Sequence, residues 1–159
     1  MQDLQGRIDE VCRIAVRLEK ETGCPAQEIV AQWAIESQWG GKPAGQHNYF
    51  GIKRAARHTK FCTVRTREVI NGQSVMQDLE FADYDSLADS CADFAWLITH
   101  GSPYAAAWKG YQQNHALSIF LTAVARVYAT DPHYAQLVLT IANQGNVKGA
   151  IERAKAVTA

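Results

Sequence analysis

The chain has 159 residues, 47% of them hydrophobic and 20% charged, which is typical of a folded domain and excludes a disordered segment. Lys plus Arg and Asp plus Glu number 16 each, so no net field would recruit nucleic acid or an anionic membrane. The four cysteines lie far apart and the five histidines show no metal-binding spacing. We therefore expect a single domain over residues 1–159 that uses no metal or cofactor and binds no nucleic acid.

The N-terminal residues carry acidic side chains and lack a continuous apolar core, so no signal peptide is expected. No run approaches the roughly 20 apolar residues that span a bilayer. We expect a protein that is made in the cytoplasm and is not stably inserted in a membrane.

The first predicted element is a helix over about Leu4 to Leu18, because apolar residues recur there at helical spacing. A second helix is expected to begin at Pro25 and to run to Trp39. Gly40 and Gly41 would end it. Residues 42 to about 60 are rich in polar and basic side chains and are predicted to form a loop.

Residues 61–81 change to a period of two, which predicts strands. Asn71-Gly72 is the strongest short-range hairpin signal, because both positions of the turn need a positive φ. A register that pairs Ile70 with Gln73 places Glu68 near the turn. It shares the strand face whose base is mainly apolar and is expected to be buried.

The rest of the chain is predicted to be helical, with each helix bounded by a capping residue, a proline or a glycine. In chain order we expect a helix capped by Asp83 or Asp85 that ends at Gly101, a shorter one after Ser102-Pro103, one over Leu117 to Val127, one from Asp131-Pro132 to about Ala142 that Gly145 ends, and a tail over Val147 to Ala159. The organisation is helical with one inserted hairpin.

A carboxylate stands inside the apolar helical stretch AQWAIESQWGG, residues 31–41. This carboxylate, Glu36, is flanked by Trp33 and Trp39, and a carboxyl group shielded from water by indole rings has a raised pKa. A general acid needs such a pKa to hold its proton near neutral pH. A partly exposed carboxylate at a helix end, with no chemical role, is the alternative.

Glu68 on the hairpin is a second candidate carboxylate. Glycoside hydrolysis uses two: one protonates the glycosidic oxygen, and the other orients water or stabilises the developing cation. Aromatic side chains suit the apolar faces of sugar rings. The alternatives are core packing for the aromatic residues and, for Glu68, a solvent-facing strand residue paired with an arginine. The basic run from Lys53 to Arg67 is either a solvated face or a rim that meets an acidic polymer.

Five blocks of sequence, in order, resemble the glucosaminidase family of peptidoglycan hydrolases, which includes the muramidase-like domain of flagellar rod-cap proteins, autolysins and phage lysins. The blocks are AQWAIESQWGG, HNYFGIK, TRE with the ING turn, FADYDSLADS and YATDPHY. The resemblance implies an α+β lysozyme-like fold, with a mainly helical lobe, a small β-hairpin lobe over about residues 60–82 and a cleft between them. It implies cleavage of the β-1,4 bond after N-acetylglucosamine, by an endo-β-N-acetylglucosaminidase.

The resemblance also assigns residues. Glu36 matches the family's catalytic acid, Glu68 matches the glutamate of its T-x-E motif, and Tyr128 matches a tyrosine near the acetamido group of the sugar. The other candidates for substrate binding are Trp39, Asn48, Phe50 and Tyr134, although Asn48 has a structural role as its alternative. The chain departs from the family's usual residues at Gln38, Tyr49 and Val127, which puts the shape of the subsites in doubt.

Two other functions stay open. A muramidase or lytic transglycosylase of the same fold would cut the other glycosidic bond, and a non-catalytic module would only bind the wall. The expected partners are peptidoglycan glycan strands. We expect phage, flagellar, conjugation or secretion machinery to deliver the protein to the periplasm or cell wall.

Overall fold

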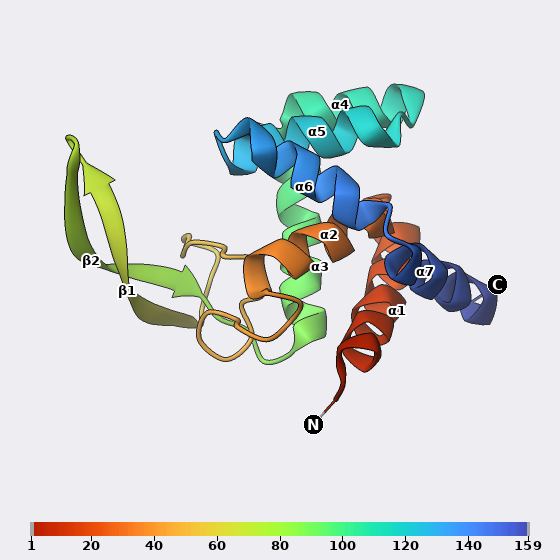
Figure 1. Cartoon of the computed structure of the whole chain (residues 1–159), viewed down its shortest axis with the longest axis horizontal. Coiled ribbons are helices and arrows are strands. Elements are labelled where there is room, and N and C mark those ends of the chain that lie inside the picture. Colours follow the sequence, from red (N-terminus) through yellow and green to blue (C-terminus); the bar gives the residue numbers. More distant parts are fainter. Residues whose placement is uncertain (1, 159) are drawn as a thin grey trace.

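The computed structural model describes residues 2–158 and shows a helical body from which a two-stranded hairpin projects (Figure 1). The elements are α1 Leu4–Thr22, α2 Ala26–Ser37, β1 Phe61–Ile70, β2 Gln73–Ala82, α3 Leu87–His100, a 3₁₀ turn η1 Ser102–Tyr104, α4 Ala105–Asn114, α5 Leu117–Tyr128, α6 Pro132–Ala142 and α7 Gly145–Thr158. Among these residues no helix combines the length and apolarity needed to cross a bilayer.

Helix α2 is the central helix of the body. It packs against α1, α3, α6 and α7, and Figure 1 shows it between the α4–α5–α6 group and the α1–α7 pair. A helix enclosed on most sides is buried almost all round. Ile29, Val30 and Trp33 are accordingly core residues, and the polar residues Glu28, Gln32 and Ser37 of α2 are also fully buried.

The C-terminus of α2 lies two residues before the predicted end at Trp39. Gln38, Trp39 and Gly40 all have positive φ, at 51°, 59° and 79°, so the chain leaves the helix after Ser37. The Ser37 hydroxyl accepts a hydrogen bond from the Gly40 amide at 2.8 Å. A side chain at Gly40 would lie 2.7 Å from the buried Trp33 ring. Packing against Trp33 therefore requires a glycine here and fixes the exit of the chain.

The loop over residues 42–60 is organised by the buried Asn48 side chain. Its amide donates to the carbonyl oxygens of Ile52 and Ala82, both at 2.8 Å. Its Oδ1 accepts from the amides of Phe50 and Ile52 at 3.2 Å. One side chain thus joins this loop to the end of β2.

We expect Asn48→Ala to lower the free energy of unfolding by about 3 kcal/mol, because it leaves several buried backbone groups without their partners. Urea denaturation followed by circular dichroism measures this loss. Asn143→Ala is the matched control, because the exposed Asn143 amide donates only to the carbonyl of Leu139. An equal, small loss in both variants would contradict the role given to Asn48.

The hairpin has the predicted register. Ile70 pairs with Gln73 and Glu68 with Val75, and Asn71 and Gly72 have φ of 51° and 77°. The expectation of a buried face is wrong, because alternate residues of β1 are only half-buried. The hairpin meets the loop only near its base, where the amide of Ala82 donates to the carbonyl of Ile52, and it then extends away from the helices (Figure 1).

Two predicted helix boundaries also differ. Ser86, and neither Asp83 nor Asp85, caps α3, with its hydroxyl accepting from the Asp89 amide. The Asp83 carboxylate is engaged instead by backbone amides of the loop, at Gln46 and His47. Gly145 begins α7 where the sequence predicted only the end of the preceding helix.

Candidate active site

A groove of about 320 Å³ opens between the loop at Gly51–Lys53 and the helical body. Its wall is formed by Gly51, Ile52, Lys53, Ala55, Arg57, Leu97, Tyr104 and Tyr128. Glu36, near the end of α2, adjoins it: a Cβ at Gly51 would lie 3.4 Å from Glu36 Oε2. Gly51 has a φ of +66°, a backbone conformation that favours glycine. Glu36 Oε2 thus lies beside Gly51, one of the residues that line the groove.

Burial raises the pKa of the Glu36 carboxyl, and a hydrogen bond from the Tyr134 hydroxyl lowers it by a smaller amount. The Tyr134 hydroxyl donates to Glu36 Oε1 at 2.5 Å. The raised pKa was predicted from the sequence, but the polar partner was not. The indole of Trp33 packs instead beneath Gly40 and edge-on to Trp39, with the ring centroids 6.1 Å apart.

Tyr134 links two helices at this carboxyl. Asp131 caps α6 by accepting from the His133 amide, which places Tyr134 in the first turn. There its hydroxyl donates to Glu36 and accepts a hydrogen bond from Gln32 Nε2. Tyr134 is thus the hydrogen-bonding partner of the candidate acid, which the sequence did not indicate. Its predicted contact with the substrate stays a prediction.

We expect Tyr134→Phe to raise the pKa of Glu36 further, because the hydrogen bond that lowers it is removed. A general acid loses activity as the pH rises through its pKa, so the alkaline limb of the pH profile should move to higher pH. The measurement is kcat/KM against pH for both proteins. Tyr111→Phe is a control, because it removes the same hydroxyl group at another place, where the Tyr111 ring of α4 packs against Phe120 of α5. An unmoved limb in Tyr134→Phe would refute the prediction.

Tyr128 stands at the groove beside Tyr134. The two rings are nearly parallel, with an interplanar angle of 6° and centroids 6.4 Å apart. The Tyr128 hydroxyl donates to the carbonyl oxygen of Phe50 at 2.5 Å. Its proton is thereby committed to the loop, and its oxygen retains the capacity to accept a hydrogen bond from an N–H group in the groove.

Asn48 and Phe50 do not line the groove as predicted. Both side chains are fully buried: Asn48 holds the loop together, and Phe50 stacks on Phe94 with the centroids 4.4 Å apart. They support the groove from beneath, and Phe50 contributes its carbonyl oxygen to Tyr128. Trp39 is half-buried beside Trp33, and its carbonyl accepts from Arg7 at 2.9 Å. Its role in substrate binding stays a prediction.

Among residues 2–158 no hydrogen bond or ion pair joins Glu68 to Glu36. Glu68 lies near the turn of the hairpin, which projects away from the helical body that contains α2 (Figure 1). Within residues 2–158 the Glu68 carboxylate forms no hydrogen bond or ion pair, so the alternative of an arginine partner is not realised. The neighbouring Arg65 pairs with Asp78 across the hairpin at 3.0 Å.

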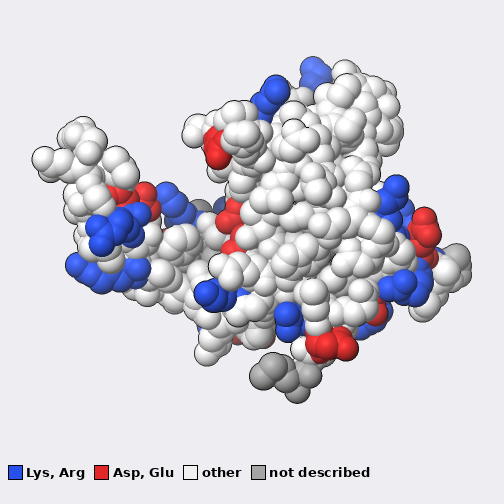
Figure 2. Space-filling view, viewed as in Figure 1, with Lys and Arg blue, Asp and Glu red and all other residues white. Residues whose placement is uncertain are grey.

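The basic run is largely neutralised by acidic neighbours. Arg54 pairs with Glu80 at 2.6 Å, and Arg57 pairs with Asp93 at 3.2 Å. Figure 2 shows basic and acidic side chains mixed around the hairpin, with no continuous basic face in this view. The interpretation as a solvated face therefore fits better than an anion-binding rim. Lys53 and Arg57 are the members of the run that line the groove, and both are exposed.

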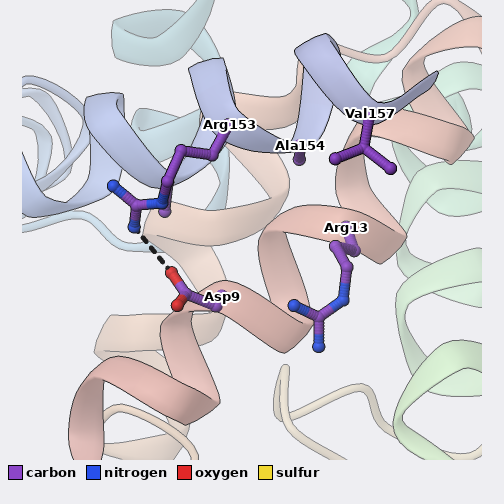
Figure 3. Close-up of a pocket in the computed structure, with 6 residues that line it drawn as sticks. Asp9, Arg13, Arg153, Ala154 and Val157 are labelled. Carbon is purple, nitrogen blue, oxygen red and sulfur yellow. Dashed lines mark hydrogen bonds and ion pairs between the residues drawn. The ribbon is translucent and has the colours of Figure 1, made fainter.

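A second pocket, of about 190 Å³, lies between α1 and α7 (Figure 3). Arg153 donates to Asp9 across it at 2.8 Å. Hydrogen bonds, first from Gln5 and then from Arg153, hold the pKa of Asp9 below its usual value. This pocket has no acid that could hold a proton near neutral pH. No group of metal-ligating side chains occurs among residues 2–158.

Comparison with known proteins gives one family. The model of the glucosaminidase family, described as mannosyl-glycoprotein endo-β-N-acetylglucosaminidase, matches residues 12–147. The chain is 30% identical to peptidoglycan hydrolase FlgJ of Escherichia coli K12 over 134 residues, which are 79% of this chain and 41% of that protein. It is 28% identical over 148 residues to a probable N-acetylmuramidase of Lactococcus lactis, covering 88% of this chain and 33% of that protein. The chain thus spans less than half of these curated relatives.

Solved structures are similar over nearly the whole chain. The catalytic domain of the autolysin Auto of Listeria monocytogenes superposes with a TM-score of 0.81 at 25% identity, covering 94% of this chain and 89% of that one. A mutant peptidoglycan hydrolase of Sphingomonas sp. A1 gives 0.74 at 28% identity, covering 94% and 99%. These neighbours confirm the predicted α+β, lysozyme-like fold.

Proposed function

The chain belongs to the glucosaminidase family of glycoside hydrolases, and from this premise we propose that it cleaves the β-1,4 bond after N-acetylglucosamine in peptidoglycan. The observation that carries the proposal is the Glu36 carboxyl beside Gly51 of the groove, with its pKa raised by burial and its Oε1 accepting a hydrogen bond from Tyr134. The similarity to solved peptidoglycan hydrolases supports the substrate class.

In the proposed first step, neutral Glu36 protonates the glycosidic oxygen as the bond to the anomeric carbon breaks. Tyr134 donates to Oε1, so the acidic proton of neutral Glu36 belongs on Oε2. Oε2 is the oxygen beside Gly51, which lines the groove. This position supports a transfer of the proton to a sugar bound in the groove.

The second step has two candidate routes. In the first, the N-acetyl group of the substrate attacks the anomeric carbon, and the Tyr128 oxygen orients it by accepting from the acetamido N–H. In the second, the hairpin closes over the groove and Glu68 acts as the base for a water on the opposite face. The fixed position of Tyr128 beside Tyr134 supports the first route, and the unpaired Glu68 carboxylate is free to serve the second.

We expect Glu68→Gln to retain a measurable part of kcat if the substrate's own acetamido group assists, and to lose kcat about 100-fold or more if Glu68 is the base. The measurement is kcat on soluble glycan fragments. Glu80→Gln, on the second strand of the same hairpin, is the control for changes in hairpin charge. If Glu68→Gln lost all of its kcat while the control kept its own, a mechanism in which the substrate's acetamido group acts without Glu68 as a base would be excluded.

The bond specificity is tested by digesting purified peptidoglycan, reducing the products with borohydride and identifying the new ends by mass spectrometry. Reduced N-acetylglucosaminitol ends, absent with Glu36→Gln, would support the proposal. Reduced muramitol ends would support a muramidase instead, an alternative that the Lactococcus relatives favour by name. Anhydro-muramic ends would identify a lytic transglycosylase, and no products from folded protein would favour a wall-binding module.

We propose that the protein acts on glycan strands in the periplasm or cell wall, where phage, flagellar, conjugation or secretion machinery delivers it. The relatives named peptidoglycan hydrolase and autolysin support the site of action. Fractionating cells that produce the protein, with detection in the wall fraction, tests this.

A further inference from the structure

A second carboxyl group lies inside the helical body on the same helix as Glu36. Glu28 is 0% exposed, and neither of its oxygens has a hydrogen-bonding partner among residues 2–158. Burial raises the pKa of this carboxyl to about 8, so it holds a proton at neutral pH. A fully buried, unpartnered polar group destabilises a fold, so its presence in the middle of α2 calls for a physical reason.

Glu28, Gln32 and Glu36 are spaced by four residues and therefore share one face of α2. Gln32 is also fully buried, and its Oε1 has no partner within the described residues. One helical turn thus separates an unused acceptor, Gln32 Oε1, from a neutral carboxylic acid that carries one unused donor.

Beyond Gln32 the chain of hydrogen bonds has a direction. Gln32 Nε2 donates to the Tyr134 oxygen, and the Tyr134 hydroxyl donates to Glu36 Oε1. Tyr134 has a single proton to donate, so this order requires that the Gln32 amide turn its nitrogen, and not its oxygen, toward Tyr134. The Gln32 oxygen is then the amide atom that is left without a partner among residues 2–158.

We propose that Glu28 is a positioning residue for Glu36: as a neutral acid it donates to Gln32 Oε1 and so fixes the direction of the chain Glu28, Gln32, Tyr134, Glu36. With each donor directed toward Glu36, Oε1 can only accept, and the acidic proton stays on Oε2 at the groove. This proposal rests on the assignment of Glu36 as the general acid.

Without a donor at position 28 the Gln32 amide is free to flip. Its oxygen would then accept from Tyr134, Tyr134 would accept from Glu36, and the acidic proton would move to Oε1, away from the groove. Ionising Glu28 has the same consequence, because a carboxylate accepts and does not donate. Burial is the cause of the raised pKa of Glu28, and its charge would raise the pKa of Cys24 before α2, Tyr104 in η1, Tyr128 in α5 and Tyr134 in α6. The lysine of α7 that lies near this end of the body, Lys155, pairs with Glu19 of α1.

The test compares Glu28→Gln, whose amide still donates, with Glu28→Leu, which cannot. In protein labelled with ¹³C at the glutamate side-chain carboxyl, we expect Glu28 itself to titrate near pH 8. Glu36 should titrate at the wild-type pH in Glu28→Gln and at a higher pH in Glu28→Leu. Gln32→Met, which breaks the chain one step later, should behave like Glu28→Leu and serves if the leucine variant does not fold. Glu152→Gln, on the exposed face of α7, is the control.

Kinetics give the second readout. We expect Glu28→Leu to lower kcat about tenfold with KM unchanged. This loss is part of the about 10²–10⁴-fold in rate that a positioned general acid contributes. Glu28→Gln should keep most of the wild-type kcat. The proposal would be overturned if Glu36 titrated at the same pH in Glu28→Gln and Glu28→Leu. It would also be overturned if these two variants had the same kcat. The titration needs no substrate. If it follows the expected pattern while the digestion shows another product, the bond assignment fails and the positioning role stands.

Discussion

Glu36→Gln is expected to lower kcat on peptidoglycan by at least about 100-fold, and by up to about 10⁴-fold, because an amide has no proton to transfer to the glycosidic oxygen. The substitution keeps the shape of the side chain, and the amide oxygen can still accept from Tyr134. KM should therefore change little. The measurement is steady-state release of reducing ends from purified peptidoglycan, with the folded state checked by thermal unfolding.

Glu152→Gln provides the matched control for Glu36→Gln. It makes the same chemical change at an exposed position of α7, away from the groove, and should leave kcat at the wild-type value. Retention of more than a tenth of the wild-type kcat by Glu36→Gln would remove Glu36 from the role of general acid. The groove would then need another proton donor, for which Tyr104 and Tyr128 are too weakly acidic because burial raises their pKa.

The second large effect concerns stability. Between pH 5 and pH 8 the wild-type protein should lose free energy of unfolding as the pH rises, on the order of 3 to 4 kcal/mol from Glu28 alone. The folded state keeps the Glu28 proton up to a pKa of about 8, whereas the unfolded chain releases it near the ordinary glutamate pKa of 4.5. The folded state thus binds more protons in this window. The contribution is fully present below pH 4.5 and is lost as the pH rises through 8.

Urea denaturation at pH 5, 6.5 and 8 measures this slope, and Glu28→Gln should flatten most of it. Glu36 adds to the slope with the same sign, because its pKa is also raised, so some slope should remain. Asp83 and Asp93 act in the opposite direction, but their lowered pKa values place their effect below about pH 4. Equal slopes in the wild type and Glu28→Gln would show that Glu28 is not buried as a neutral acid.

Features that depend on neighbours in the sequence could be predicted from it. The period of apolar residues gave the helices, and Asn71-Gly72 set the register of β1 and β2, because both signals arise from local geometry. The raised pKa of Glu36 followed from its place in an apolar helical stretch. Helix ends were less certain, since the end of α2 depends on how Gly40 packs over Trp33.

The tertiary structure alone decided which groups meet. Tyr134 reaches Glu36 across 98 positions of sequence, and no local pattern could show that its hydroxyl donates to the Glu36 carboxyl. The same holds for Asn48, whose partners Ile52 and Ala82 lie on different segments. In the sequence Glu28 is an ordinary polar residue near a helix start. It becomes a neutral acid because α2 is enclosed by other helices, and that enclosure removes the water that would ionise it.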